Sequence, residues 1–293
     1  MLKDKYLPII MQEVAQIRKT YNLDSNAPIC DYIFAILKNE CILLEWPEDK
    51  QLDLDGLSTE KVIGDRLETI VYINSTKNKE KQNFCAAHEL GHRHKLDRQI
   101  KDAFPEDIIT NAVIEDVMNR FAAELMMPEN DFSRRSSRLY KTCQGKQADR
   151  NVIYIKKLLE SVAALMDYYF VPYKAVTLRL QETKIVPDRA VEVLLGFEET
   201  DAGKNIIDEI IKQQGITRLR TPDRKAQYSI QLENLRAIVK DPDITKYMTE
   251  NELKKHLKTM GFEAEDIKLI EDMKRIEAET IEVDENKVPG NQT

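Results

Sequence analysis

The stretch FCAAHELGHRHKLD, residues 84–97, carries three of the four histidines in the chain. Two of them, His88 and His92, are four residues apart in the order HELGH. On an α-helix this spacing places both side chains on one face, about one turn apart, so that two imidazole nitrogens can bind one metal ion. The stretch therefore predicts a helix with a metal site, around which the rest of the domain packs.

The residues between the two histidines fit catalysis by a metal. Glu89 stands where this motif places a carboxylate that reaches a water on the open position of the ion. Zinc lowers the pKa of that water towards about 7, so that a carboxylate can accept its proton. We expect Leu90 to face the core and Gly91 to let another element approach closely. An incidental pair of histidines is the alternative, but random placement of four histidines would rarely produce this motif.

A catalytic zinc site needs a third ligand from the protein. A longer motif with a third histidine requires glycine at 95 and histidine at 98, and this chain has Lys95 and Arg98 there. His256 lies far along the chain in a charged helical segment, and we expect it on the surface. The ligand is then a carboxylate on the helix predicted over 108–127, which offers Glu115, Asp116 and Glu124.

Periodicity leaves two of these carboxylates open. Glu115 borders the apolar stripe of its helix, where burying an unpaired carboxylate is costly and a metal would remove that cost. Glu124 follows the small residues Ala122 and Ala123. Of the remaining candidates, His94 is expected to face away from the pair and to lie on the surface. Cys85, three residues before His88, is expected to be a buried free cysteine.

Composition limits the class of protein. The 293 residues have a net charge of −7, which argues against a protein built chiefly to bind nucleic acid or an anionic membrane. The four cysteines form no close pair and read as reduced thiols. No signal-peptide core and no apolar run of 18 residues are visible. We therefore expect a soluble, cytoplasmic protein without membrane contact; its oligomeric state is left open.

The hydrophobic pattern predicts an α+β fold. Apolar positions recur at helical spacing over 5–20, 30–38, 79–97 and 108–127. Compact apolar runs predict strands at 40–46 and 66–75, with turns and a further short strand between them. Residues 133–150 are basic and polar and are predicted to form a loop or linker.

The second half of the chain is predicted to be mainly helical. Residues 161–180 read as two short helices broken around Phe170–Pro172, the size of a helix-turn-helix. The second of these helices offers only Lys174, Thr177 and Arg179 for DNA contacts, which favours a packing module that supports the site over DNA binding. Further on, Thr249 and Glu252 fit a capping box that Gly261 closes, and the last ten residues are expected to be disordered. We divide the chain into a metal-site domain over 1–132, a helix-turn-helix-like segment over 133–185 and a helical region of unknown role over 186–293.

Two blocks together resemble a known family. KEKQNFCAAHELGH (79–92), followed by EDVMNRFAAELMMP (115–128), is similar to the ImmA/IrrE family of metallopeptidases, and the likeness covers about residues 1–180. The resemblance implies a zincin-like domain, with a small sheet packed on the motif helix and its neighbours. It implies zinc on His88, His92 and Glu115, Glu89 as general base, and a supporting role for Glu124. Val117 and Met118 depart from the usual pattern, and we expect them to affect packing more than metal binding.

The resemblance also implies a function. Members of the family regulate helix-turn-helix transcriptional repressors by cleaving them, so the expected function is a zinc endopeptidase that relieves repression, an anti-repressor. The ligand set favours zinc, although manganese also accepts such ligands. The alternative is a regulator that binds a repressor or DNA without cutting it, with a structural metal site. A general base, which pure binding does not require, favours the enzyme.

Overall fold

The computed structural model describes residues 4–47, 54–63, 66–143, 150–222 and 227–228. The first part of the chain forms a sheet and the helices around it. In order these are η1 (Asp4–Tyr6), α1 (Leu7–Thr20), η2 (Cys30–Tyr32), α2 (Ile33–Glu40), β1 (Ile42–Trp46), β2 (Gly56–Ile63), β3 (Arg66–Asn74), α3 (Lys79–Arg93), α4 (Leu96–Ala103) and α5 (Asn111–Met126). The described residues of the second part are helical except for one short strand: α6 (Glu129–Cys143), α7 (Arg150–Tyr169), α8 (Tyr173–Glu182), α9 (Asp188–Glu199), α10 (Asp201–Gln213), η3 (Arg218–Arg220) and β4 (Gln227–Tyr228).

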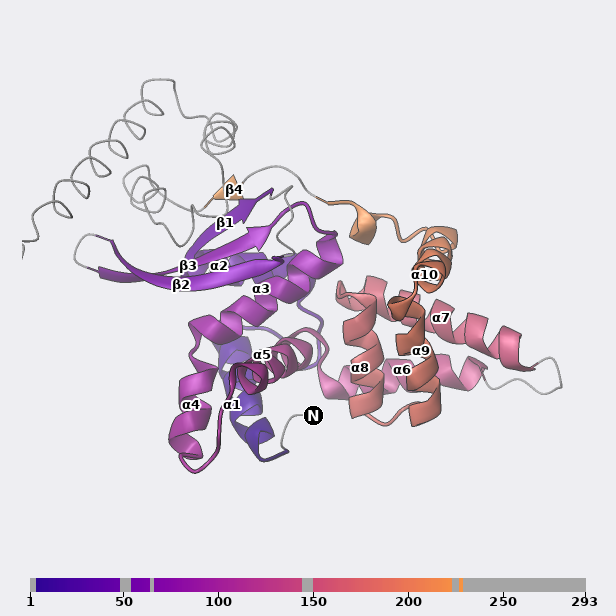
Figure 1. Ribbon diagram of the computed structural model, residues 1–293, viewed down its shortest axis with the longest axis horizontal. Helices are drawn as coiled ribbons and strands as arrows, with labels where there is room; N and C mark the ends of the chain where they lie inside the picture. The colour runs from indigo at the N-terminus through magenta and orange to yellow at the C-terminus, as the bar shows by residue number, and fades with distance from the viewer. Residues whose placement is uncertain (1–3, 48–53, 64–65, 144–149, 223–226, 229–293) are drawn as a thin grey trace, which may run out of the picture.

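The sheet has the strand order β2-β3-β1-β4. β1 runs parallel to β3, with Ile42 opposite Ile70, and β2 runs antiparallel to β3, with Gly56 opposite Ile73. β4 pairs antiparallel with the other side of β1. Side chains of β1 and β3 join the main hydrophobic core, and α3 packs across β2 and β3 (Figure 1). The sheet thereby supports α3 along its length, which fixes the helix that carries the HELGH motif.

The contact between α3 and α5 depends on one glycine. A Cβ atom at Gly91 would lie 2.8 Å from Met118 Sδ and 3.0 Å from Phe121 Cδ1, closer than packed side chains approach. Leu90, beside it, is fully buried in the core. Both expectations for the Leu-Gly pair are confirmed: one residue anchors α3 in the core and the other lets α5 lie directly against it.

The second group of helices packs largely on itself. α6 contacts α7, α7 contacts α8 and α10, α8 contacts α9, and α9 contacts α10. Figure 1 shows this group beside the half of the molecule that holds α3 and α5. The short helix η3 returns from α10 to contact α3. Within the described residues no helix is both long and apolar enough to cross a membrane.

The α+β class and the main elements are confirmed, and two boundaries are wrong. Residues 133–143 belong to helix α6 and not to a loop, because Phe132, Ser136 and Cys143 form a buried stripe at helical spacing. The basic residues of this segment occupy the opposite, solvated face, which hid the stripe. The helix expected to reach residue 97 ends at Arg93, and Lys95 takes a left-handed conformation with φ 53° between α3 and α4.

The break predicted around Phe170–Pro172 is confirmed, since α7 ends at Tyr169 and α8 begins at Tyr173. The expected capping box at Thr249 and Glu252, its closing Gly261, the histidine at 256 and the last ten residues lie outside the described residues.

Candidate metal centre

The predicted ligands come together from two helices. His88 and His92 project from one face of α3, and their Nε2 atoms are 3.2 Å apart. Glu115, near the start of α5, points its carboxylate at both: Oε2 is 3.2 Å from His88 Nε2, and Oε1 is 3.8 Å from His92 Nε2. The ligand atoms of the three residues lie within 4.8 Å of one another. Two imidazoles and one carboxylate are a donor set that catalytic zinc uses, leaving a position free for water or substrate.

The reason given above for choosing Glu115 is wrong in one respect. Its side chain is 56% exposed, so it is not a buried carboxylate that needs a cation to offset desolvation. Its place in the site follows from the helix contact, because the close approach of α5 at Gly91 brings the second turn of α5, with Glu115, beside the histidines. Asp116, the neighbouring carboxylate, is also exposed and is not part of the cluster.

The ionisation of the three groups is coupled through one shared cluster. Burial opposes protonation of His88, but the hydrogen bond to Glu115 and the charges of Glu89 and Glu115 raise its pKa. Burial and the charge of His88 lower the pKa of His92. The hydrogen bond with His88 holds the pKa of Glu115 below its usual range. A cation bound to the three donors would replace the proton that they otherwise share.

Glu89 lies beside this cluster in an enclosed position. The residue is only 5% exposed, and its Oε1 is 3.3 Å from where a Cβ of Gly56 would be. Gly56 begins β2, and a side chain there would also crowd Tyr72 O at 2.9 Å and the thiol of Cys85. Burial raises the pKa of Glu89 to about 7, with His88 opposing the rise and Glu115 adding to it. A carboxyl with such a pKa both accepts and releases a proton near neutral pH.

Asn119 is a site residue to which the sequence reasoning gave no role. Its Oδ1 is 3.1 Å from Nδ1 of His88, so it can accept a hydrogen bond from the ring nitrogen that faces away from the cluster. That bond fixes the tautomer in which Nε2 of His88 presents its lone pair to a metal. The signal was present in the sequence, because Asn119 follows Glu115 by one helical turn and therefore faces the same way.

Two neighbouring residues were also considered as site residues. His94 was expected on the surface, and this is wrong: it lies between two carboxylates, with Nδ1 2.7 Å from Glu13 and Nε2 2.7 Å from Glu40. It therefore ties α3 to α1 and α2 and takes no part in the metal cluster. Cys85 is a free cysteine, and burial raises the pKa of its thiol well above the usual value. Among the described residues, the cluster of candidate ligand atoms consists of His88, His92 and Glu115 and does not include this thiol.

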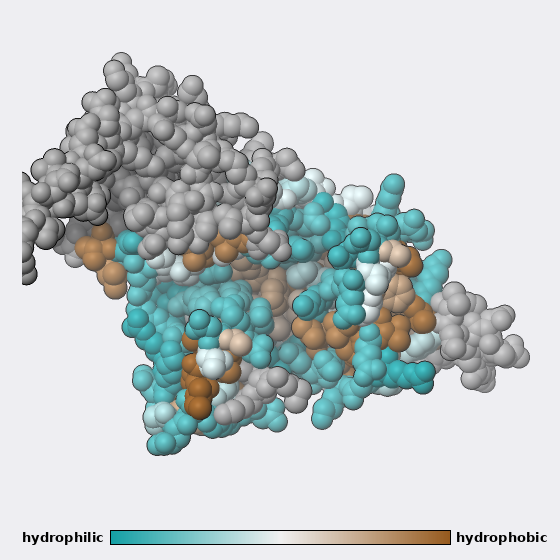
Figure 2. Space-filling model, viewed as in Figure 1, coloured by the Kyte–Doolittle hydropathy of each residue, from teal (hydrophilic) through white to brown (hydrophobic). Residues whose placement is uncertain are grey.

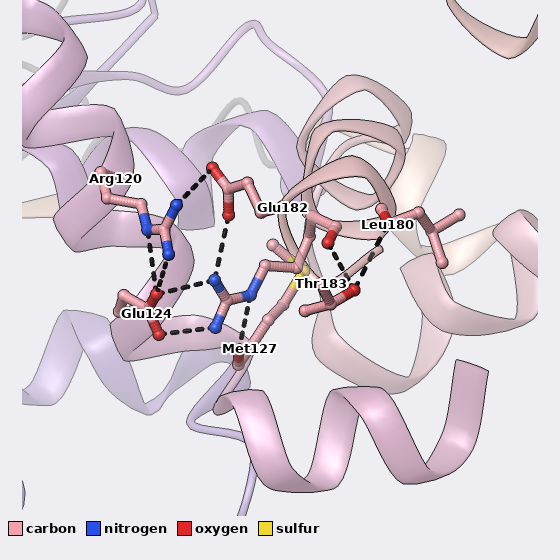
Figure 3. A network of polar contacts seen from close by, with 7 residues as sticks. Arg120, Glu124, Met127, Leu180, Glu182 and Thr183 are labelled. Carbon is pink, nitrogen blue, oxygen red and sulfur yellow. Dashed lines mark hydrogen bonds and ion pairs between the residues drawn. The ribbon is translucent and has the colours of Figure 1, made fainter. Parts of the chain in front are cut away.

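Glu124 is a structural residue, as the resemblance implied. Its side chain is 1% exposed and forms paired contacts of 2.7 and 2.5 Å with Arg179 of α8, which is itself fully buried (Figure 3). Arg120 adds a contact of 2.7 Å to Glu124 and one of 3.2 Å to Glu182. These four charges join α5 to α8, so the second group of helices is fastened to the helix that carries Glu115.

The same network bears on the helix-turn-helix-like segment. Of the three residues considered for DNA contacts, Arg179 is committed to Glu124, and Thr177 is buried with its hydroxyl donating to Tyr173 O at 3.0 Å. Only Lys174 is exposed. In this conformation α8 therefore presents a single one of its expected DNA-contacting side chains to solvent.

A cleft extends from the metal cluster between the two groups of helices. Its lining includes His88 and Glu89 from α3, Glu115 and Asn119 from α5, and Ala175 and Leu178 from α8. In Figure 2 most of this face is hydrophilic, and apolar residues show in the recess between the two groups. A chain segment lying in this cleft would pass directly by His88, Glu89 and Glu115.

Residues 49–181 match the family described as the IrrE N-terminal-like domain, Peptidase_M78. The chain carries a peptidase domain of the ImmA/IrrE family. The matched range contains both helices of the metal cluster and ends within α8, so this ImmA/IrrE domain includes all three helices named at the cleft. Comparisons with curated proteins and with solved structures gave no match.

Proposed function

We propose that this protein is a zinc-dependent endopeptidase with a zincin-like active site. The convergence of His88, His92 and Glu115 beside a buried carboxylate carries the proposal. Bound there, zinc would polarise the scissile carbonyl and lower the pKa of a water. Glu89 accepts a proton from the attacking water on its carboxylate and returns it to the nitrogen of the leaving amine, a role that suits its buried position beside the cluster.

The substrate we propose is a helix-turn-helix transcriptional repressor, whose cleavage in the cytoplasm relieves repression. The resemblance to ImmA/IrrE peptidases supports this choice, and the long cleft is consistent with a polypeptide substrate. In this proposal residues 1–132 supply the metal centre and the helices over 133–185 hold it in place through Arg179.

A binding regulator with a structural metal remains the second candidate. The packed group of helices over 150–213 favours it, because such a group offers a docking surface that needs no chemistry. Glu89 favours the enzyme, because burying a carboxylate costs free energy. Binding a repressor without cutting it does not require a buried carboxylate beside the cluster.

Co-expression separates the two candidates. A helix-turn-helix repressor encoded beside the gene would be produced with the wild type and, separately, with Glu89→Gln, followed by measurement of its intact mass. Two fragments with the wild type alone support the peptidase and identify the bond that is cut. An intact repressor recovered in complex with both proteins supports sequestration.

A further inference from the structure

One face of α3 leads from the metal cluster to a group of cations. Lys81, Phe84 and His88 of this helix all line the cleft and recur at three- and four-residue steps. Lys81 is seven residues before His88, which corresponds to about 10 Å along the helix axis. An extended peptide covers that distance in about three residues. The cleft wall therefore places a positive charge about three residues from a bond held at the metal centre.

Other elements add cations at the same end of the cleft. Lys174 of α8, Lys204 of α10 and Arg220 of η3 line it together with Lys81. At their centre is Glu198 of α9, a half-buried carboxylate that also lines the cleft. All four cations act on this group: burial raises the pKa of Glu198, and the four positive charges oppose the rise.

These cations are not equally available. Arg220 is held by Glu80 and Asp208, each at 3.1 Å, and Lys204 is 3.7 Å from Asp201. Lys81 and Lys174 are exposed, and neither forms an ion pair in the part of the chain that the structure describes. Two lysines from different helices thus face the cleft with their charges uncommitted, next to a carboxylate supplied by the protein itself.

We infer that Lys81 and Lys174 form a subsite for an acidic side chain of the peptide substrate, about three residues from the cleaved bond. This inference rests on the proposed peptidase function and adds a sequence preference to it. Glu198 lines the same part of the cleft and competes with the substrate for the same two lysines. A peptide fits better than a nucleic acid, because the whole chain carries a net charge of −7.

The test uses a mixed library of peptides from a digested bacterial proteome. The full-length zinc-loaded protein cuts the library, and mass spectrometry identifies residues around each cut. Exposed ion pairs contribute little, so we expect Asp and Glu to be enriched roughly two- to fivefold at one position about three residues from the cut. Lys81→Gln with Lys174→Gln should abolish the enrichment, whereas Glu198→Gln should increase it.

The control is Lys19→Gln with Lys212→Gln, which removes the same charge from exposed positions away from the cleft and should keep the enrichment. Equal acidic frequencies around the cuts of the wild type and the Lys81/Lys174 variant would overturn the subsite. A parallel column of immobilised Glu89→Gln protein distinguishes this failure from failure of the peptidase. If the wild type cuts nothing, the column still tests the subsite. Selective retention of acidic peptides by Glu89→Gln supports it when the retention is lost on adding the two lysine substitutions. Retention of peptides regardless of their charge refutes it.

Discussion

Replacing Arg179 by methionine should destabilise the protein far more than replacing an exposed arginine does. The guanidinium is fully buried and donates two hydrogen bonds to Glu124, whose side chain is 1% exposed. Removing one partner of a buried ion pair costs about 3–5 kcal/mol, because the remaining charge stays desolvated. Arg120 still contacts Glu124 at 2.7 Å, so we expect a loss of about 3 kcal/mol in the free energy of unfolding, at the lower end of that range.

A paired substitution separates burial of charge from loss of packing. Glu124→Leu combined with Arg179→Met fills similar volume without a buried charge, and should recover all but about 1 kcal/mol of the loss. Arg218→Met is the matched control: it removes an arginine that is 59% exposed from its 2.9 Å pair with Asp167, and should cost no more than about 1 kcal/mol. Urea unfolding followed by circular dichroism measures all three.

The outcome that refutes this reasoning is specific. If Arg179→Met loses less than about 1 kcal/mol, as exposed pairs do, then Arg179 and Glu124 are solvated in solution. A double variant as unstable as Arg179→Met alone would instead show that the side chains matter through their shape.

Three further predictions follow from single contacts. Gly91→Ala should lower the free energy of unfolding by about 1–3 kcal/mol and weaken metal binding, because the added Cβ meets Phe121 at 3.0 Å and pushes α5 away from α3. Urea unfolding and zinc titration measure these two effects. An unchanged stability would contradict the prediction. Asn119→Ala should weaken zinc binding about 10- to 100-fold, because it removes the hydrogen-bond acceptor that orients His88. Asn119→Asp keeps an acceptor and is the control. Equal zinc affinities for the two variants would exclude this role of Asn119. Hydrogen bonds to two carboxylates, acting against burial, raise the pKa of His94 to about 9, so its stabilising contribution is complete below the unfolded value of about 6.5 and is lost as the pH rises through 9. His94→Gln should flatten the fall in unfolding free energy between those pH values, and an unchanged pH profile would show that the ion pairs do not form.

Local signals in the sequence predicted much of the candidate metal centre. The four-residue spacing of His88 and His92 and the periodicity of 108–127 depend on neighbours along one helix, so both helices were found. Gly91 also predicted a close contact with another element, but the sequence did not indicate that this element is α5. The choice of Glu115 came from the resemblance, since periodicity alone left Glu124 open as a second possibility.

The contacts that the sequence did not reveal are long-range. Arg179 and Glu124 are 55 residues apart, and His94 is 81 residues from Glu13; nothing in a local pattern indicates such partners. Helix α6 was missed for another reason: its buried stripe is narrow, and the basic residues around it read as a linker. Burial was misjudged at Glu115 because the edge of an apolar stripe can face a cleft as well as the core.

The most direct test of the central claim is zinc-dependent cleavage by the purified protein. Metal would be removed with a chelator and restored stepwise, while zinc content and cleavage of the proposed substrate, a helix-turn-helix repressor encoded beside the gene, are measured on the same samples. We predict that cleavage rises with zinc up to one ion per chain, and that Glu89→Gln binds the same amount of zinc but leaves the repressor intact. Cleavage that persists without metal, or in Glu89→Gln, would contradict the account.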